Sequence, residues 1–78
     1  MTRGEAMAFA ISVGKPIRHK SFSKGEFVRY KGKELVDEDE IILPQQEFWA
    51  IRSGGSWENG WRFLRWLYGL DLHYVYAD

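Results

Sequence analysis

The sequence contains no cysteine, so no disulfide can hold this chain of 78 residues together. A chain of this length must fold as one domain, with about 60–65 % of its unfolded surface buried in a single core. Domains of this size often gain stability by forming oligomers. We therefore treat residues 1–78 as a single domain.

Four tryptophans fall between Trp49 and Trp66. A small core needs one or two such side chains, and further flat rings often stack on a ligand or anchor a partner. We expect Trp66 in the core, and one of Phe48 and Trp49 buried while the other faces out. Trp57 lies in a polar segment, where a ligand or interface role is expected.

The net charge is zero, but the charges are segregated along the chain. Between Lys15 and Lys33 nearly all charged residues are basic, whereas the charged residues from Glu34 to Glu40 are all acidic. The neutral total makes a nucleic-acid partner unlikely on electrostatic grounds, while the local basic stretch suits an anionic ligand. No apolar run reaches the roughly 18 residues of a membrane span, and the N-terminus lacks signal-peptide features. We expect a cytoplasmic protein without membrane contact.

The first residues predict a short helix over residues 3–13. Thr2 and Glu5 have the spacing of a capping box, and apolar residues recur behind them at helical intervals. Gly14 is a suitable C-cap, and Pro16 prevents the helix from continuing.

Strand patterns follow. Short strands are expected at residues 17–20, 26–31, 35–36 and 41–43, with a tight turn at 31–33 and an acidic hairpin tip at 37–40. Aromatic and β-branched residues favour a strand at 48–52. Asn59 can cap a helix ending near Tyr68, before Gly69 and a last strand at 70–76. This predicts an α+β fold: a small antiparallel sheet with an N-terminal helix and a second short helix before the last strand.

No catalytic constellation is present. His19 and His73 are the only histidines, and their spacing matches no zinc motif. The acidic tip lacks the alternating ligands of a calcium loop, and Ser56 lacks the context of a nucleophilic serine. We expect no catalytic residues, no metal and no cofactor, hence a binding protein and not an enzyme.

Two segments are candidate ligand-binding elements. The first interleaves cations with an aromatic ring, which suits a phosphate-bearing ligand; its residues are Arg18, Lys20, Phe22 and Lys24. The second combines flat rings with an amide; its residues are Trp57, Asn59 and Trp61. Asn59 has a competing role as a helix cap.

The order of motifs resembles a known family. Gly4-Glu5-Ala6, Gly14-Lys15, Ile17 and Arg18 match its opening pattern, and Trp61 and Asp71 match its C-terminal part. The sequence is similar to the small phage-encoded Thoeris anti-defence sponge proteins over about two-thirds of the chain. Phe22 and Leu72 stand where that family has tryptophan.

The resemblance implies a homo-oligomer, a dimer or tetramer, in the host cytoplasm. Such a protein would sequester a cyclic-nucleotide or cyclic ADP-ribose immune signal at subunit interfaces without cleaving it. It adds Asp71 to the expected ligand-binding residues. Two alternatives remain open: a small inhibitor that binds a host protein through Trp49 or Trp57, and a single-stranded nucleic-acid-binding module.

Overall fold

The computed structural model describes the backbone of residues 1–66 and 74–77, and the side chains as far as residue 64. Two helices, α1 (Arg3–Val13) and α2 (Gln45–Ile51), accompany a short 3-10 helix, η1 (Gly55–Glu58). The strands are β1 (Ile17–His19), β2 (Val28–Lys31), β3 (Glu34–Asp37), β4 (Ile42–Leu43), β5 (Trp61–Trp66) and β6 (Tyr74–Ala77).

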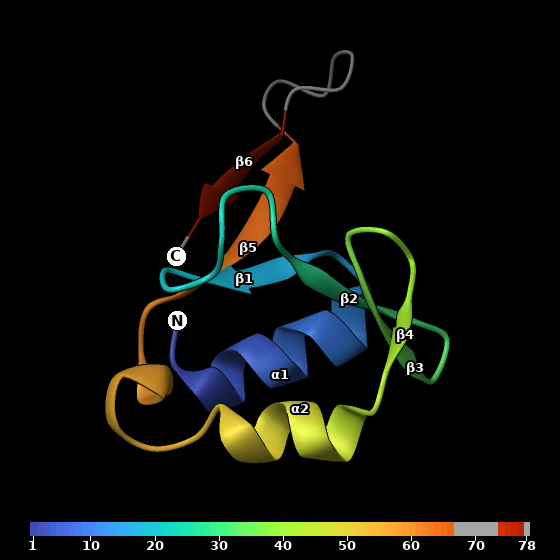
Figure 1. Cartoon of the computed structure of the whole chain (residues 1–78). Coiled ribbons are helices and arrows are strands. Elements are labelled where there is room, and N and C mark those ends of the chain that lie inside the picture. Colours follow the sequence, from blue (N-terminus) through green and yellow to red (C-terminus); the bar gives the residue numbers. More distant parts are fainter. Residues whose placement is uncertain (67–73, 78) are drawn as a thin grey trace.

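All strand pairs are antiparallel, in the order β4-β3-β2-β1-β5-β6. Figure 1 shows both helices on one side of β1 and β2, and the β5–β6 hairpin rising on the far side. The α+β class expected from the sequence is confirmed. Neither helix within residues 1–66 has the length and hydropathy needed to cross a bilayer.

Helix α1 has the boundaries that its capping residues predict. Thr2 Oγ1 accepts a hydrogen bond from the Glu5 amide, and Glu5 accepts one from the Thr2 amide. Gly14 ends the helix at a φ of 75°, a left-handed conformation that glycine adopts without steric cost. Ala6 and Ala10 are fully buried, so the helix approaches the aromatic core closely.

The sheet places alternate residues of β1 on opposite faces. Ile17 and His19 are fully buried on the helix side, while Arg18 points to the opposite face. There Arg18 is the register partner of Arg62 on β5. The helix side of the sheet therefore forms the core together with α1 and α2.

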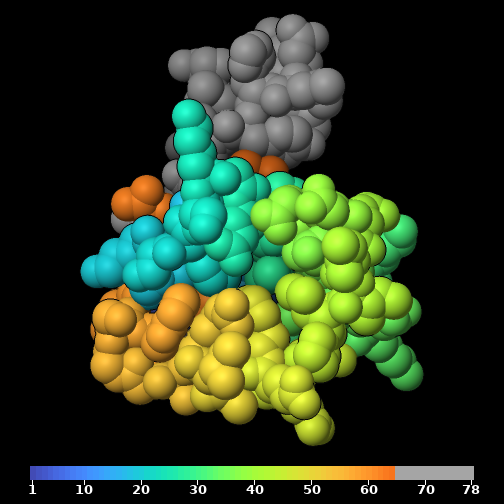
Figure 2. Space-filling view, in the orientation of Figure 1, coloured from blue at the N-terminus to red at the C-terminus, as the bar shows by residue number. Residues whose placement is uncertain are grey.

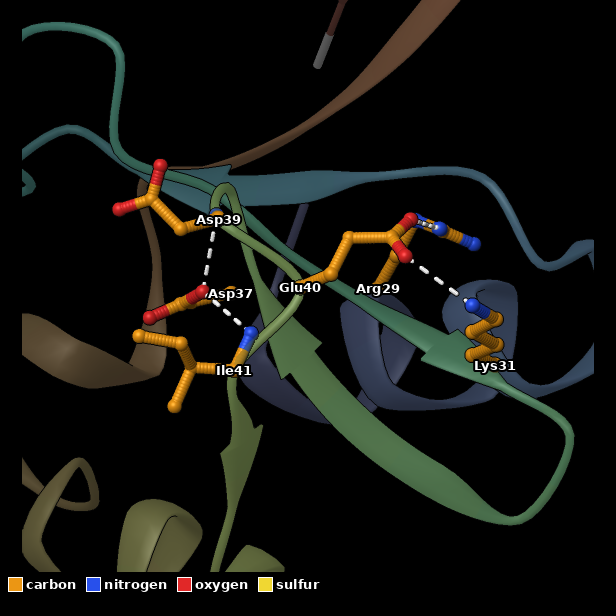
Figure 3. A network of polar contacts seen from close by, with 6 residues as sticks. All are labelled: Arg29, Lys31, Asp37, Asp39, Glu40 and Ile41. Atoms are coloured by element: carbon orange, nitrogen blue, oxygen red, sulfur yellow. Dashed lines mark hydrogen bonds and ion pairs between the residues drawn. The ribbon is translucent and has the colours of Figure 1, made fainter.

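The acidic tip between β3 and β4 is an ordered turn (Figure 3). Asp37 Oδ1 accepts the amides of Asp39 and Ile41 at 2.8 and 2.9 Å. Glu40 has a positive φ of 62°, and its carboxylate pairs with Lys31 Nζ at 3.0 Å and with Arg29. These hydrogen bonds, Lys31 first and then Arg29, lower the pKa of Glu40.

The strand predicted at 48–52 is wrong, because these residues belong mainly to α2. Pro44 precedes the helix, and two glutamines and a glutamate, all good helix formers, begin it. The helix turns both aromatic residues inward: Phe48 is 6 % and Trp49 5 % exposed. The expectation that only one of them is buried is therefore also wrong.

The helix predicted from Asn59 is wrong as well, because Trp61–Trp66 is strand β5. Asn59 is extended, with φ −139°, and follows the end of the 3-10 helix η1 as its C-cap residue, so it is not the N-cap of a helix. Burial alternates here as it does in a strand, because Trp61 is fully buried and Arg62 is exposed. Residues 61–63 also pair with β1. The expected end of that helix, Gly69 and the start of the last strand lie outside the described residues, and the side chain of Trp66 is not described.

Candidate ligand-binding site

The structure brings the two predicted binding segments together. The Lys20 amide donates to the Gly60 carbonyl at 2.9 Å. The Lys20 side chain also lies against the Gly60 backbone, where an added Cβ would be 2.9 Å from Lys20 Cδ. In Figure 2 the β1–β2 loop (cyan) lies against the segment of residues 55–60 (orange). Glycine at position 60, with φ 87°, makes this close approach possible.

The buried His19 ring hydrogen-bonds to both the β1–β2 loop and the 55–60 segment, at the junction where the two meet. Its Nε2 lies 2.7 Å from the Asn59 carbonyl and 3.0 Å from the Ser56 carbonyl, and its Nδ1 accepts the Ser21 amide at 3.0 Å. These partners assign the proton to Nε2, since a carbonyl accepts and an amide donates. Both ring nitrogens of this fully buried histidine are occupied, so it serves the architecture of the loop and is not available as a general base.

The aromatic residues expected to stack on a ligand are largely part of the core. Trp61 is fully buried and donates from Nε1 to the Trp57 carbonyl at 2.7 Å. Phe22 is 8 % exposed and packs edge-on against Trp61, with ring centroids 5.6 Å apart. The stacking roles predicted for Phe22 and Trp61 therefore do not fit the folded chain. Trp57 remains partly exposed, with its ring 4.4 Å from that of His19.

The predicted cations lie around the same loop. Arg18 Nη2 donates to the Phe22 carbonyl at 3.2 Å, which ties the strand to the loop. Lys20 and Lys24 are exposed, and Lys24 precedes the left-handed Gly25. The Asn59 side chain is exposed, while its carbonyl serves His19. Asp71, the residue added by the family resemblance, lies outside the described residues, as does His73.

Arg52 is a residue that sequence reasoning missed. Its guanidinium lies 4.0 Å above the Phe48 ring and 5.7 Å from the Trp57 ring, and Nη1 donates to the Phe48 carbonyl at 3.3 Å. Its Nε is buried without a hydrogen-bond partner. The signal is the spacing Phe48-x-x-x-Arg52, which brings the two side chains together only on a helix.

A second arginine, Arg3, joins the helices. Its Nε and Nη2 donate to the carbonyls of Arg52 and Trp49, each at 2.7 Å, and thereby satisfy the C-terminal end of α2. The guanidinium also lies 5.5 Å from the Trp49 ring. Arg3 thereby holds the C-terminal end of α2 against α1, and from this end the chain leads into η1 and Trp57.

One cluster of possible metal ligands occurs among the described residues. Carboxylate oxygens of Asp37, Glu38 and Asp39 lie within 4.8 Å of one another. Asp37 uses one oxygen to shape the turn, while Glu38 and Asp39 are exposed. This geometry fits the solvated hairpin tip expected from the sequence.

The described part of the site combines fixed backbone, exposed cations and one accessible indole ring. It can neutralise and contact an anionic, ring-bearing molecule, but it brings no nucleophile and base into reach of each other. Comparisons with protein family models, curated proteins and solved structures gave no match to this chain.

Proposed function

We propose that this protein binds a small phosphate-bearing molecule of the cyclic-nucleotide or cyclic ADP-ribose type and sequesters it intact. The observation that carries the proposal is the junction of the cationic β1–β2 loop with the Trp57 segment. The Lys20 amide donates a hydrogen bond to the Gly60 carbonyl, and the buried His19 ring hydrogen-bonds to the Ser56 and Asn59 carbonyls of the Trp57 segment. A site whose backbone is fixed before binding loses little entropy when a ligand arrives.

Capture without cleavage agrees with the chemistry of the described residues. A hydrolase needs a positioned acid or base, and His19 has both nitrogens engaged. The remaining side chains of the site are lysine, arginine, asparagine and tryptophan, which supply charge, donors and a flat ring. The family resemblance points the same way, toward a phage counter-defence protein in the host cytoplasm.

The proposal includes assembly into a homo-oligomer, a dimer or tetramer. Among the side chains that the structure describes, five large aliphatic ones are more than half exposed: Ile11, Val13, Ile41, Ile42 and Ile51. Burial of Ile11, Val13, Ile41 and Ile42 between subunits would add stability to a domain with a small core. Light scattering coupled to gel filtration measures the mass in solution, and a monomer at micromolar concentration would contradict this part of the proposal.

The deciding experiment is a thermal melt with a panel of cyclic dinucleotides and cyclic ADP-ribose isomers. A ligand at about 100 times its Kd adds about 2.7 kcal/mol, which raises the midpoint by about 10 °C or more in a domain of this size. Mass spectrometry of the ligand released by denaturation should recover it unchanged. A flat response to every member of the panel, or recovery of a cleaved product, would refute the proposal.

Matched variants test the site itself. Lys20→Gln should weaken binding by about tenfold or more, because a hydrogen bond to a charged group is lost. Trp57→Leu keeps a smaller apolar side chain but removes the flat face, so it should also weaken binding. Lys33→Gln makes the same charge change in the β2–β3 turn and should bind normally.

The alternative of a host-protein inhibitor anchored by tryptophans loses one of its two anchors. Trp49 is 5 % exposed, and its Nε1 donates to the Tyr30 hydroxyl at 3.1 Å. A single-stranded nucleic-acid module likewise needs exposed rings, and Phe22 is in the core.

A further inference from the structure

A concave surface lies apart from Lys20 and Lys24 of the proposed ligand site, and neither lysine lines it. A pocket of about 280 Å³ opens where the end of the β1–β2 loop, the β3–β4 turn and α2 meet. Figure 2 shows the hollow between the cyan loop, the yellow-green turn and the yellow helix. Its apolar lining consists of Val28, Leu43, Pro44, Phe48 and Ile51.

The floor of this pocket is rigid, and its rim is open. Val28 and Phe48 belong to the core cluster, so the floor cannot collapse without unpacking the domain. Ile51, on the rim, is 70 % exposed. An occupant would therefore remove this isoleucine from water, which favours binding.

The charged groups of the rim are predominantly carboxylates, from Glu26, Asp37, Glu38 and Glu47. The salt bridges of the described residues use Glu40, and none involves these four acids. Glu26 and Asp37 accept backbone amides of the chain, whereas Glu38 and Glu47 are exposed. The single cation of the lining, Arg52, has its guanidinium over the Phe48 ring.

We propose that this pocket docks an arginine or lysine side chain, flanked by an apolar residue, from an extended segment of a partner protein. The aliphatic stem of such a side chain packs on an apolar floor while its head reaches the carboxylates. The flanking apolar residue covers Ile51. A volume of about 280 Å³ suits one long side chain and lies just below the range of about 300–1,000 Å³ typical of small-molecule pockets.

The carboxylates of this pocket lie apart from the lysines of the proposed ligand site, although Arg52 borders both Phe48 in the pocket and Trp57 in the site. Lys20, at the start of the β1–β2 loop, contacts Gly60, whereas Glu26, at the end of the same loop, lines the pocket. Sequestration of a nucleotide-type molecule and docking of a basic segment can therefore succeed or fail separately.

The test is a titration of the isotope-labelled protein with defined peptides, followed by amide NMR shifts. The probe is the acetylated and amidated peptide Gly-Ile-Arg-Ile-Gly. We expect saturable shifts centred on the amides of Glu38, Glu47 and Ile51, with a Kd in the millimolar range. The same peptide with glutamate in place of arginine should produce none.

Variants and a small cation complete the design. The double variant Glu38→Gln/Glu47→Gln should bind the arginine peptide about fivefold or more weakly. Glu34→Gln, the same change outside the pocket, should leave the affinity unaltered, and the spectra show that each variant is folded. The proposal is overturned by absence of saturable shifts at the pocket, by equal binding of the glutamate peptide, or by equally tight binding of free spermidine.

Discussion

Replacement of His19 by phenylalanine tests whether this buried side chain holds the site together. Phenylalanine fills a similar volume but removes three contacts, those with the Ser21 amide and the Ser56 and Asn59 carbonyls. At about 1 kcal/mol for each neutral hydrogen bond, and more where a group stays buried and unpaired, we expect a loss of about 2–4 kcal/mol. A domain of this length has about 4–12 kcal/mol in total, so the loss is large.

Urea unfolding followed by tryptophan fluorescence measures this loss, with an unchanged m value indicating an unchanged compact state. Two further variants separate the contacts. His19→Gln can keep a donor near the two carbonyls, and His19→Asn can keep an acceptor near the Ser21 amide, so each should be more stable than His19→Phe. If His19→Phe unfolds within about 0.5 kcal/mol of the original protein, the hydrogen bonds of His19 do not stabilise the junction and the reasoning is refuted.

Three other changes have definite expected outcomes. Gly60→Ala should destabilise the fold by about 1–2 kcal/mol in urea unfolding, because φ is 87° and the new methyl group meets Lys20, and an unchanged midpoint would contradict the geometry. Trp61→Ala should cost about 3–5 kcal/mol, since the ring is fully buried, and a folded, equally stable variant would show that Trp61 is not a core residue. The hydrogen bond from the Thr2 amide lowers the pKa of Glu5 in the folded protein. The ionised Glu5 therefore stabilises the fold fully at any pH above the pKa of Glu5 in the unfolded chain, and this stabilisation is lost as the pH falls through the lower pKa of Glu5 in the folded protein. Glu5→Ala should therefore be less stable than the original chain at pH 7, with the difference shrinking below about pH 4 in parallel melts, and a difference independent of pH would rule out this linkage.

The parts of the fold that depend on local chemistry could be predicted. The capping box at Thr2 and Glu5, the C-cap at Gly14 and the hairpin turns each depend on residues a few positions apart. The two wrong assignments, at α2 and β5, depend on distant partners. β5 is a strand because residues 61–63 pair with β1, some forty residues earlier in the chain, and this pairing outweighs an ambiguous local pattern.

The candidate site shows the same division. In the sequence, Lys20, Trp57 and Asn59 lie in two polar segments, and the structure brings these segments together. The local sequence does not distinguish a ring that stacks on a ligand from a ring that packs in the core, because Phe22 and Trp61 have the same apolar faces in either role. The contact of Arg52 with Phe48 could not be predicted from the sequence, because the two side chains meet only when α2 is helical.

The central position of the short strand β1 has consequences for the order of folding. The β1–β2, β2–β3, β3–β4 and β5–β6 pairs join neighbouring segments, whereas the β1–β5 pairing closes a loop of about forty residues, at a higher entropic cost. We expect the local pairs to form first and the β1–β5 pairing to complete the sheet late, in the rate-limiting step. The amide protons of Lys20 and Leu64, which bond to the Gly60 and Pro16 carbonyls across this pairing, should then exchange with solvent only when the whole domain unfolds.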